Sequence, residues 1–455
     1  MRIHFIAIGG AVMHNLALTL HENGHQVTGS DDEIYDPSRS RLAKYGLLPE
    51  TMGWHPDRIT NDLDVIILGM HARKDNPELA KAQELNLPIY SYPAYIYEHS
   101  KNKKRVVIAG SHGKTTTTSM ILHVLKYHQV DFDYLVGAQI EGFELMARLS
   151  DAPIIIMEGD EYPSSPTDLR PKIHHYFPHL AVITGIAWDH MNVFPTFENY
   201  KSQFEQFLEM IQAGGKLYYY ERDEHLGEML QDKSFSFEAT PYQAFNAIIE
   251  NGKTSIQGES GTSADLQIFG NHNLSNLKAA FHICKDLGIS EADFFEAIAS
   301  FKGAAKRLQL LREESQMLAY LDFAHAPSKV EATIKALKAQ FPDRELVACL
   351  ELHTFSSLNK AFLPQYAQTM DAADHALVFF SEHTLEMKRL PKITKQEVAE
   401  AFQHPNIQVF TETEKLQDVL LAMQWTNKNL LMMSSGTFGG IKYEEFAARL
   451  ELHQG

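Results

Sequence analysis

The sequence lacks the features that mark secreted and membrane-spanning proteins. It contains only two cysteines, Cys284 and Cys349, which lie in separate regions and without CxxC spacing. This pattern supports neither a disulfide framework nor a thiolate zinc site. No apolar run approaches the roughly 18–20 residues of a membrane span, and the apolar run at the N-terminus is shorter than the core of a signal peptide. We therefore expect a protein of the reducing cytoplasm.

Basic residues are also few: 41 Lys and Arg stand against 58 Asp and Glu, which gives a formal net charge of -17. Affinity for a nucleic-acid backbone or an anionic membrane surface comes from clustered Lys and Arg. We therefore predict neither as a partner. Hydrophobic residues make up 44% of the chain and charged residues 22%, which is typical of globular proteins. A chain of 455 residues has room for about three domains.

Short apolar runs alternate with turns and amphipathic stretches in three successive parts of the chain. This alternation predicts βα units with parallel sheets, hence an α/β fold of three domains in series. A basic break at 101–105 and a hinge at 302–305 place the domains at 1–103, 104–303 and 304–455. The predicted strands are Ile3–Ile8, His25–Thr28, Val65–Leu68, Ile89–Tyr90, Val106–Ala109, Ile154–Met157, Ala181–Thr184, Ala319–Phe323, Leu346–Leu350, Ala376–Phe380, Ile407–Phe410 and Leu430–Met433.

Between Gly215 and Gly270 the pattern changes to short alternating runs. Asn251-Gly252 is typical of a hairpin turn. We predict an antiparallel addition within the central domain, followed by a helical stretch over Asn273–Phe301.

The strongest motif is Val-Val-Ile-Ala-Gly-Ser-His-Gly-Lys-Thr-Thr at residues 106–116. A strand that runs into glycines and then into Lys-Thr at a helix start surrounds a polyphosphate with backbone N–H groups and the helix dipole. Lys114 would contact the outer phosphates and Thr115 a Mg²⁺ ion. The full GxxxxGK[ST] pattern requires glycine at position 108, where Ile108 stands, so the loop is a shortened variant. An ordinary βα turn with an exposed lysine is the alternative.

Acidic residues follow the next long strand of this domain. Glu158, Asp160 and Glu161 come directly after Ile154–Met157, at the sheet edge where α/β proteins bind ligands. Carboxylate oxygens suit Mg²⁺, so we predict a metal site, with a solvated acidic turn as the alternative. His190 follows the neighbouring strand in the same way and should emerge beside Glu158, although a lone histidine is more often structural.

A weaker nucleotide signal lies near the N-terminus. A GxGxxG motif that starts at Gly9-Gly10 would require glycine at positions 11 and 14, where Ala11 and His14 occur. Asp31 lies about twenty residues after this turn, where dinucleotide-binding folds carry a ribose-binding carboxylate. A nucleotide site and a tight turn with a helix-capping aspartate fit this pattern equally well.

Further candidates flank the predicted hinge. Asn273 and Asn276 lie three residues apart on one helical face and could read an adenine edge, although helix capping is the usual role of asparagine. Arg307 could reach a phosphate, with an ordinary exposed arginine as the alternative. Asp322 and His325 lie in a polar loop at the end of a predicted strand.

Together these motifs occur in the order seen in the Mur ligases, which the chain resembles over essentially its whole length. The matching segments are Gly110–Thr116, Glu158–Glu161, Asp189-His190-Met191, Gly270-x-His272-Asn273-x-x-Asn276, Arg307 and Asp322-Phe-Ala-His325-x-Pro327. Mur ligases are ATP-dependent enzymes that form amide bonds in peptidoglycan synthesis. The resemblance implies a Rossmann-like N-terminal domain for a UDP-sugar, a central P-loop ATPase domain and a Rossmann-like C-terminal domain that admits the incoming amine.

The resemblance also implies roles for individual residues. The implied ATP contacts are Gly110, Ser111, His112, Gly113, Lys114, Thr115, Thr116, Asn273, Asn276, Arg307 and Asp322. The implied UDP-sugar contacts are Gly9, Gly10, Ser30, Asp31 and His71. Thr115, Glu158 and His190 would hold Mg²⁺, and the catalytic residues would be Lys114, Glu158, His190 and Arg307. Several members carry a carbamylated lysine where this chain has Glu205, so we expect either its carboxylate to serve or none to be needed. Candidates for peptide recognition are His353, Ser356, Asn359 and Ser435.

The implied reaction joins the lactyl carboxylate of UDP-N-acetylmuramate to an amine through an acyl phosphate. The favoured amine is the tripeptide L-alanyl-γ-D-glutamyl-meso-diaminopimelate, as in peptidoglycan recycling. The segments that most resemble this branch of the family are Met1–His4, Val27–Asp31, Glu158–Tyr162, His174–Tyr176 and Phe438–Ile441, and the L-alanine branch usually carries serine where Tyr162 stands. L-Alanine is the alternative amine. Two rivals lie outside this chemistry: an NAD-dependent oxidoreductase and a non-catalytic nucleotide-binding protein with the same fold.

Overall fold

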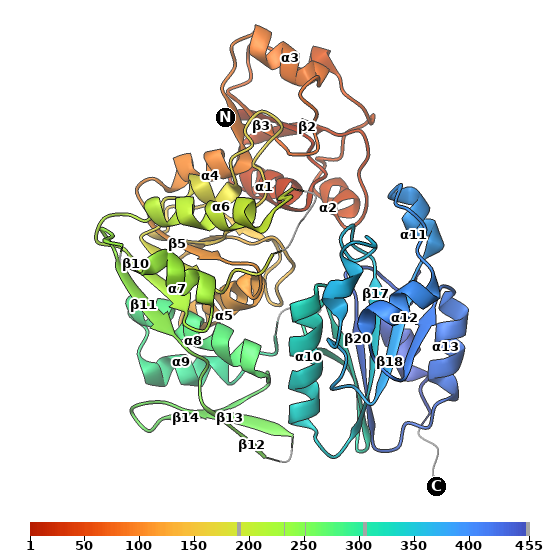
Figure 1. Cartoon of the computed structure of the whole chain (residues 1–455). Helices are drawn as coiled ribbons and strands as arrows, with labels where there is room; N and C mark the ends of the chain where they lie inside the picture. Colours follow the sequence, from red (N-terminus) through yellow and green to blue (C-terminus); the bar gives the residue numbers. More distant parts are fainter. Residues whose placement is uncertain (189–192, 232, 251, 304–306, 452–455) are drawn as a thin grey trace. The chain divides into compact units, whose positions relative to one another are not determined.

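The structure is a computed structural model of the chain (Figure 1), and it describes residues 1–188, 193–231, 233–250, 252–303 and 307–451. The chain forms two compact units. The first unit comprises Met1–Ile186, Phe197–Gln243 and Ala279–Ile289. The second unit comprises Ala187–Thr196, Ala244–Lys278 and Ser290–Gly455. Each unit is described by itself.

The first unit begins with a four-stranded parallel sheet in the order β2-β1-β3-β4. Its strands are β1 (Arg2–Ile6), β2 (Gln26–Ser30), β3 (Val65–Leu68) and β4 (Ile89–Ser91), and its helices are α1 (Ala11–Glu22), α2 (Ser38–Lys44), α3 (Pro77–Glu84) and α4 (Tyr92–Ser100). The central strand β1 pairs Ile3 with Val27 on one side and with Val65 on the other. The four strands predicted for this part of the chain are confirmed.

A second sheet of the same unit has the order β11-β10-β9-β5-β8-β6-β7. Its strands are β5 (Lys104–Ala109), β6 (Asp133–Leu135), β7 (Ala147–Arg148), β8 (Ile154–Glu158), β9 (Leu180–Ile183), β10 (Lys216–Tyr220) and β11 (Glu238–Tyr242), and its helices are α5 (Lys114–Tyr127), α6 (Phe197–Glu209) and α7 (Glu224–Leu230). Among the strand pairs described for this sheet, only β6–β7 is antiparallel. Because β5 lies between β8 and β9, the loops that follow these three strands meet at one sheet edge.

The prediction for 215–270 is half right. Strand β10, which contains Tyr218, is parallel to both β9 and β11, so the prediction of antiparallel strands is wrong there. The reason is that helix α7 connects β10 to β11 as a crossover, which short alternating runs do not reveal. The antiparallel part is a separate three-stranded sheet of the second unit. It consists of β12 (Ala247–Glu250), β13 (Lys253–Gln257) and β14 (Ser263–Leu266).

The second unit is built around a six-stranded sheet in the order β15-β16-β20-β17-β18-β19. Its strands are β15 (Gln309–Glu314), β16 (Met317–Asp322), β17 (Glu345–Leu352), β18 (His375–Phe380), β19 (Ile407–Phe410) and β20 (Lys428–Met433). The helices from this point on are α8 (Asn271–Asp286), which the two units share, α9 (Glu291–Ile298), α10 (Pro327–Gln340), α11 (Glu382–Met387), α12 (Lys395–Phe402), α13 (Thr413–Ala422) and α14 (Tyr443–Ala448). Helix α10 covers one face of the sheet (Figure 1) and buries Ile334 and Leu337 there.

Two details of this unit differ from the sequence-based expectation. The sequence analysis missed the edge strand β15, which is antiparallel to β16 and only half-buried. The helical stretch over 273–301 is two helices, α8 and α9, with Gly288 at positive φ between them. The three α/β regions in series are confirmed.

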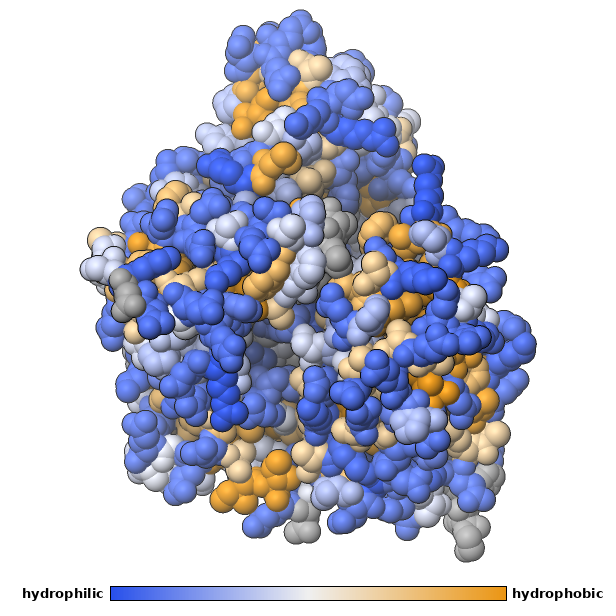
Figure 2. Space-filling model, viewed as in Figure 1, coloured by the Kyte–Doolittle hydropathy of each residue, from blue (hydrophilic) through white to orange (hydrophobic). Residues whose placement is uncertain are grey.

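Hydrophilic residues cover most of the face shown in Figure 2, with apolar residues in small groups. Within the described part of the chain, no helix combines the length and the apolar character needed to cross a bilayer.

Candidate nucleotide-binding site

The loop between β5 and α5 is shaped by two glycines with positive φ. Gly110 has φ +122° and Gly113 has φ +83°. A Cβ atom on Gly110 would overlap Thr184 Oγ1 and lie 2.8 Å from the Thr184 nitrogen, so no side chain fits there. The loop therefore passes close to Thr184 and leads directly into the first turn of α5. The N–H groups and the positive end of the helix dipole at this turn attract anions. The predicted segment 110–116 lies in this turn and in the first turn of α5.

Lys114 provides a fixed positive charge at this loop. Its Nζ donates to the carbonyl oxygen of Gly110 at 2.7 Å and pairs with Glu161 Oε2 at 3.1 Å. Burial lowers the pKa of Lys114, but the neighbouring carboxylates of Glu161, Asp160 and Glu158 outweigh this effect and hold the pKa above its usual value. Lys114 is therefore an ammonium ion at neutral pH. The alternative of an ordinary turn with an exposed lysine is wrong, because only 12% of the Lys114 side chain is exposed.

Thr115 and Glu158 form the candidate metal site. Thr115 Oγ1 donates to Glu158 Oε1 at 2.5 Å, and Glu158 Oε2 accepts the N–H of Gly137 at 3.0 Å. Burial raises the pKa of Glu158, and the charge of Asp160 adds to the effect. Among the described residues, no three His, Cys, Asp or Glu side chains converge on one point. A hydroxyl and a single carboxylate fit Mg²⁺, which is usually held by one or two carboxylates and by substrate phosphates. The third predicted ligand, His190, lies outside the described residues.

The three acidic residues after β8 have different partners. Glu158 contacts the start of α5, whereas Glu161 is fully buried and pairs with the loop lysine. Asp160 pairs with Lys172 at 3.4 Å, and the Lys172 ammonium lies 5.6 Å from the ring centroid of Tyr162. A solvated acidic turn is thus contradicted by the burial and pairing of Glu161.

The sequence analysis missed Tyr200, which lies on α6 and reaches the same loop. Its hydroxyl donates to Glu161 Oε1 at 3.0 Å and lies 2.8 Å from Ser111 Oγ. Tyr200 has no exposed surface. In the sequence it is one of several aromatic residues on an amphipathic helix, so nothing distinguishes it from a core residue. Glu205, which the sequence pointed to on this helix, is exposed.

The candidate UDP-sugar residues lie together at the carboxyl ends of β1, β2 and β3. Asp31 Oδ2 accepts the N–H of Gly9 at 2.7 Å, and His71 lies beside Gly10. Ser30 is fully buried at the end of β2. Burial raises the pKa of Asp31 to about 6, although the bond from Gly9 opposes the shift. The geometry is compatible with a sugar site, and the assignment of these five residues stays a prediction.

The remaining ATP candidates belong to the second unit. Asn273 and Asn276 are buried in the first turns of α8, where Asn273 Nδ2 donates to the carbonyl oxygen of residue 269 at 2.9 Å. Asp322 accepts backbone N–H groups of residues 308 and 324, both at 2.7 Å. Arg307 stacks on the ring of Phe323, 4.8 Å from its centroid. Their contacts with a nucleotide stay predictions.

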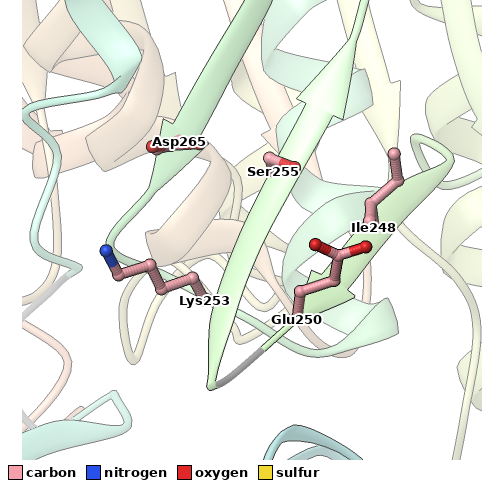
Figure 3. Close-up of a pocket in the computed structure, with 5 residues that line it drawn as sticks. All are labelled: Ile248, Glu250, Lys253, Ser255 and Asp265. Atoms are coloured by element: carbon pink, nitrogen blue, oxygen red, sulfur yellow. The ribbon is translucent and has the colours of Figure 1, made fainter.

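The second unit contains two further polar regions. Of the candidate peptide-binding residues, His353 lies 3.6 Å from the buried carboxylate of Glu351, at the end of β17. A polar pocket with a volume of about 260 Å³ lies on the small antiparallel sheet (Figure 3) and contains none of the predicted site residues. It is lined by Ile248, Glu250, Lys253, Ser255 and Asp265.

Comparisons with known proteins agree with this fold. Three family models match consecutive parts of the chain: "Mur ligase family, catalytic domain" at residues 2–104, "Mur ligase middle domain" at 108–284 and "Mur ligase, glutamate ligase domain" at 306–436. The chain is 27% identical over 450 residues to the UDP-N-acetylmuramate–L-alanyl-γ-D-glutamyl-meso-2,6-diaminoheptandioate ligase of Escherichia coli, with 97% of this chain and 96% of the relative covered.

A second relative and a solved structure are also similar to this chain. The chain is 30% identical over 383 residues to the UDP-N-acetylmuramate–L-alanine ligase of Lactiplantibacillus plantarum, with 82% of this chain and 83% of the relative covered. The crystal structure of a murein peptide ligase from Psychrobacter arcticus matches with a TM-score of 0.67 at 23% identity and covers 99% of this chain and 98% of that one. The family predicted from the motifs is confirmed: the chain belongs to the Mur ligase family.

Proposed function

We propose that this protein is an ATP-dependent ligase that joins UDP-N-acetylmuramate to the tripeptide L-alanyl-γ-D-glutamyl-meso-diaminopimelate in peptidoglycan recycling. The observation that carries the proposal is the similarity to the Escherichia coli ligase of that name, which extends over 97% of this chain. The meeting of Lys114, Thr115 and Glu158 at one loop supports ATP as the energy source. Both cysteines are free and buried, which supports a reducing compartment such as the cytoplasm.

The proposed reaction has two steps. A carboxylate oxygen of the muramic acid attacks the γ-phosphorus of ATP, ADP leaves, and an acyl phosphate forms. The α-amine of the peptide then attacks the acyl carbon, loses a proton and expels inorganic phosphate. The first step brings two anions together, so positive charge must be concentrated where they meet.

The residues of the first unit would meet this demand as follows. Lys114 would neutralise the β- and γ-phosphates. Backbone N–H groups of the loop would bind their oxygens, except that of Ser111, which donates to the Gly185 carbonyl oxygen at 2.9 Å. Thr115 and Glu158 would hold Mg²⁺ together with His190. When bound, this ion supplies charge that screens the phosphates from the attacking carboxylate.

The other predicted residues complete the proposal. Residues 1–103 would bind the UDP-sugar, 104–303 would bind ATP and 304–455 would admit the peptide. The proposed ATP contacts beyond the loop are Asn273, Asn276, Arg307 and Asp322.

The experiment that tests the proposal measures phosphate release from ATP with UDP-N-acetylmuramate present. Parallel reactions contain the tripeptide, L-alanine or no amine. Release that requires the tripeptide supports the proposal. Release that requires L-alanine would instead identify an L-alanine ligase, the activity named for the relative from Lactiplantibacillus plantarum. Release without any dependence on an amine contradicts ligase chemistry.

A further inference from the structure

A buried network of hydrogen bonds connects both sides of the phosphate-binding loop through one carboxylate. Glu161 Oε2 lies 3.1 Å from Lys114 Nζ, and Glu161 Oε1 accepts the Tyr200 hydroxyl at 3.0 Å. The Tyr200 oxygen lies 2.8 Å from Ser111 Oγ. Glu161 and Tyr200 are fully buried, and Ser111 is 5% exposed. Four side chains from three distant segments of the sequence are therefore linked in a largely buried network.

The direction of these bonds follows from proton counting. A phenol has one hydrogen to donate, and an ionised carboxylate can only accept. Tyr200 therefore gives its hydrogen to Glu161, and Ser111 must donate to the Tyr200 oxygen. Ser111 thus donates to Tyr200, and Tyr200 donates to one oxygen of Glu161. The other oxygen of Glu161 accepts from the Lys114 ammonium. Bonds of this kind to charged groups are stronger than neutral ones.

The position of Tyr200 is fixed by the packing of α6. His174 Nε2 bonds to the carbonyl oxygen of Gln203 at 2.8 Å, one turn further along this helix. The ring of Phe204, also fully buried, packs edge-on against Tyr200 with centroids 5.3 Å apart. Because the helix is held by these contacts, the hydroxyl stands at a defined place beside the loop.

We propose that Tyr200 is a positioning residue of the ATP site, which acts by holding Glu161 and Ser111 in place. A phenylalanine at this position would leave both groups without this bond. Glu161 would keep its ion pair with Lys114 but would lose the bond that fixes its second oxygen, so the carboxylate and the Lys114 ammonium would be held less precisely. Binding of a triphosphate would have to order these groups again, which weakens affinity. The inference depends on the proposed function only for its kinetic measurement.

The test compares Tyr200→Phe with a matched control in the full-length protein. Tyr218 is also buried and donates its hydroxyl to a carboxylate, Asp286 Oδ2, at 2.7 Å. Asp286 also lies against Lys104, at the opposite end of β5 from the loop. Tyr218→Phe therefore removes the same kind of bond without touching the ATP site.

The primary measurement is calorimetric titration with Mg-ADP. We expect the Kd of Tyr200→Phe to rise about tenfold, because a bond to a charged group is lost. The KM for ATP in phosphate release should rise by a similar factor, with the KM for UDP-N-acetylmuramate unchanged. Both variants should lower the melting temperature to a similar extent, because each loses one buried bond to a carboxylate. Tyr218→Phe should leave the Kd for Mg-ADP and the KM for ATP as in the wild type.

A second variant tests the route through Glu161. If Tyr200 acts through this carboxylate, Tyr200→Phe should add little to the effect of Glu161→Gln in a double-mutant cycle. Wild-type nucleotide affinity in Tyr200→Phe, an equal loss in Tyr218→Phe, or full additivity in the cycle would each overturn the inference. If the wild type binds ADP but does not ligate the tripeptide, the proposed function fails, and the titrations still decide the role of Tyr200.

Discussion

Two turns of the first unit lead from a parallel strand through glycines into a helix: the turn between β1 and α1 and the turn between β5 and α5. They are similar in sequence but differ in backbone conformation and in the charged side chains beside them. After β5, the two glycines at positions 110 and 113 have positive φ, and the next residue is a lysine. After β1, Gly10 has an ordinary φ of −59°, and the N–H of Gly9 donates to the Asp31 carboxylate. The first turn of α1 also carries His14, whose Nδ1 bonds to the Gly10 carbonyl oxygen at 2.9 Å.

This difference shows what makes a βα turn a phosphate site. An anion at the first turn would meet the negative charge of Asp31. An anion at the second turn would meet the N-terminus of α5 and the Lys114 ammonium, whose charge Glu161 and Glu158 partly offset. A carboxylate at the end of β2 suits the hydroxyl groups of a sugar. The two turns therefore fit different parts of the proposed reaction: a nucleotide sugar at the first and a triphosphate at the second.

The largest effect that would sharpen this comparison is expected from Lys114→Ala. Removing the ammonium that contacts the loop carbonyl of Gly110 should lower ligation at least about 10³-fold, because charge on the transferred phosphate is no longer neutralised. Binding of UDP-N-acetylmuramate, measured by calorimetry, should be unchanged. Lys126→Ala, an exposed position on the same helix, serves as the control. Near-normal turnover of Lys114→Ala would break the distinction between the two turns.

Alanine at one glycine of each turn gives the next largest contrast. Gly110→Ala forces a Cβ atom onto Thr184 at φ +122°, so we expect a loss of stability of about 2 kcal/mol or more and weak ADP binding. Gly10→Ala places its Cβ 3.4 Å from Met13 at an ordinary φ, so we expect a change below about 1 kcal/mol. Thermal unfolding and ADP titration of both variants measure the contrast. Equal tolerance would show that the second turn is not conformationally special.

The parts of the molecule that could be predicted are those with strong local signals. Strands β5 and β8 contain the apolar runs Val106–Ala109 and Ile154–Met157, which are almost entirely buried, and the loop after β5 has glycine and lysine at fixed spacing. The convergence of Thr115 and Glu158 follows from adjacent parallel strands, whose carboxyl ends share one edge. Local pattern and sheet geometry together were sufficient here.

The parts that could not be predicted depend on long-range contacts or on ambiguous patterns. Tyr200 contacts Glu161 and Ser111 across 39 and 89 residues of sequence, and no spacing rule connects them. Strand β15 is polar and half-buried, so it lacks an apolar run. The parallel pairing of β10 depends on the crossover through α7, whereas its three successive tyrosines fit either sheet type.

Glu158→Gln tests the metal side of the second turn and should have an intermediate effect. The amide keeps the size of the side chain but removes the charge that attracts Mg²⁺. We expect the Mg²⁺ concentration for half-maximal phosphate release to rise on the order of tenfold. Glu209→Gln, which changes an exposed carboxylate on α6, should leave the titration as in the wild type. An unchanged titration of Glu158→Gln would count against this residue as a ligand.

The smallest expected effect concerns the first turn and its dependence on pH. The pKa of Asp31 is raised from its ordinary 3.8 to about 6, chiefly by burial. The folded protein therefore binds a proton more tightly than the unfolded chain, so the contribution of Asp31 to stability is greatest below pH 3.8 and is lost as the pH rises through 6. The slope is at most about 1.4 kcal/mol per pH unit. The stability difference between Asp31→Asn and the wild type, measured by denaturant unfolding, should shift in favour of the variant from pH 4 to pH 6 and then stay level. A difference independent of pH would mean that the carboxylate of this turn is already ionised at pH 4, and the contrast in charge between the two turns would then extend over the whole range.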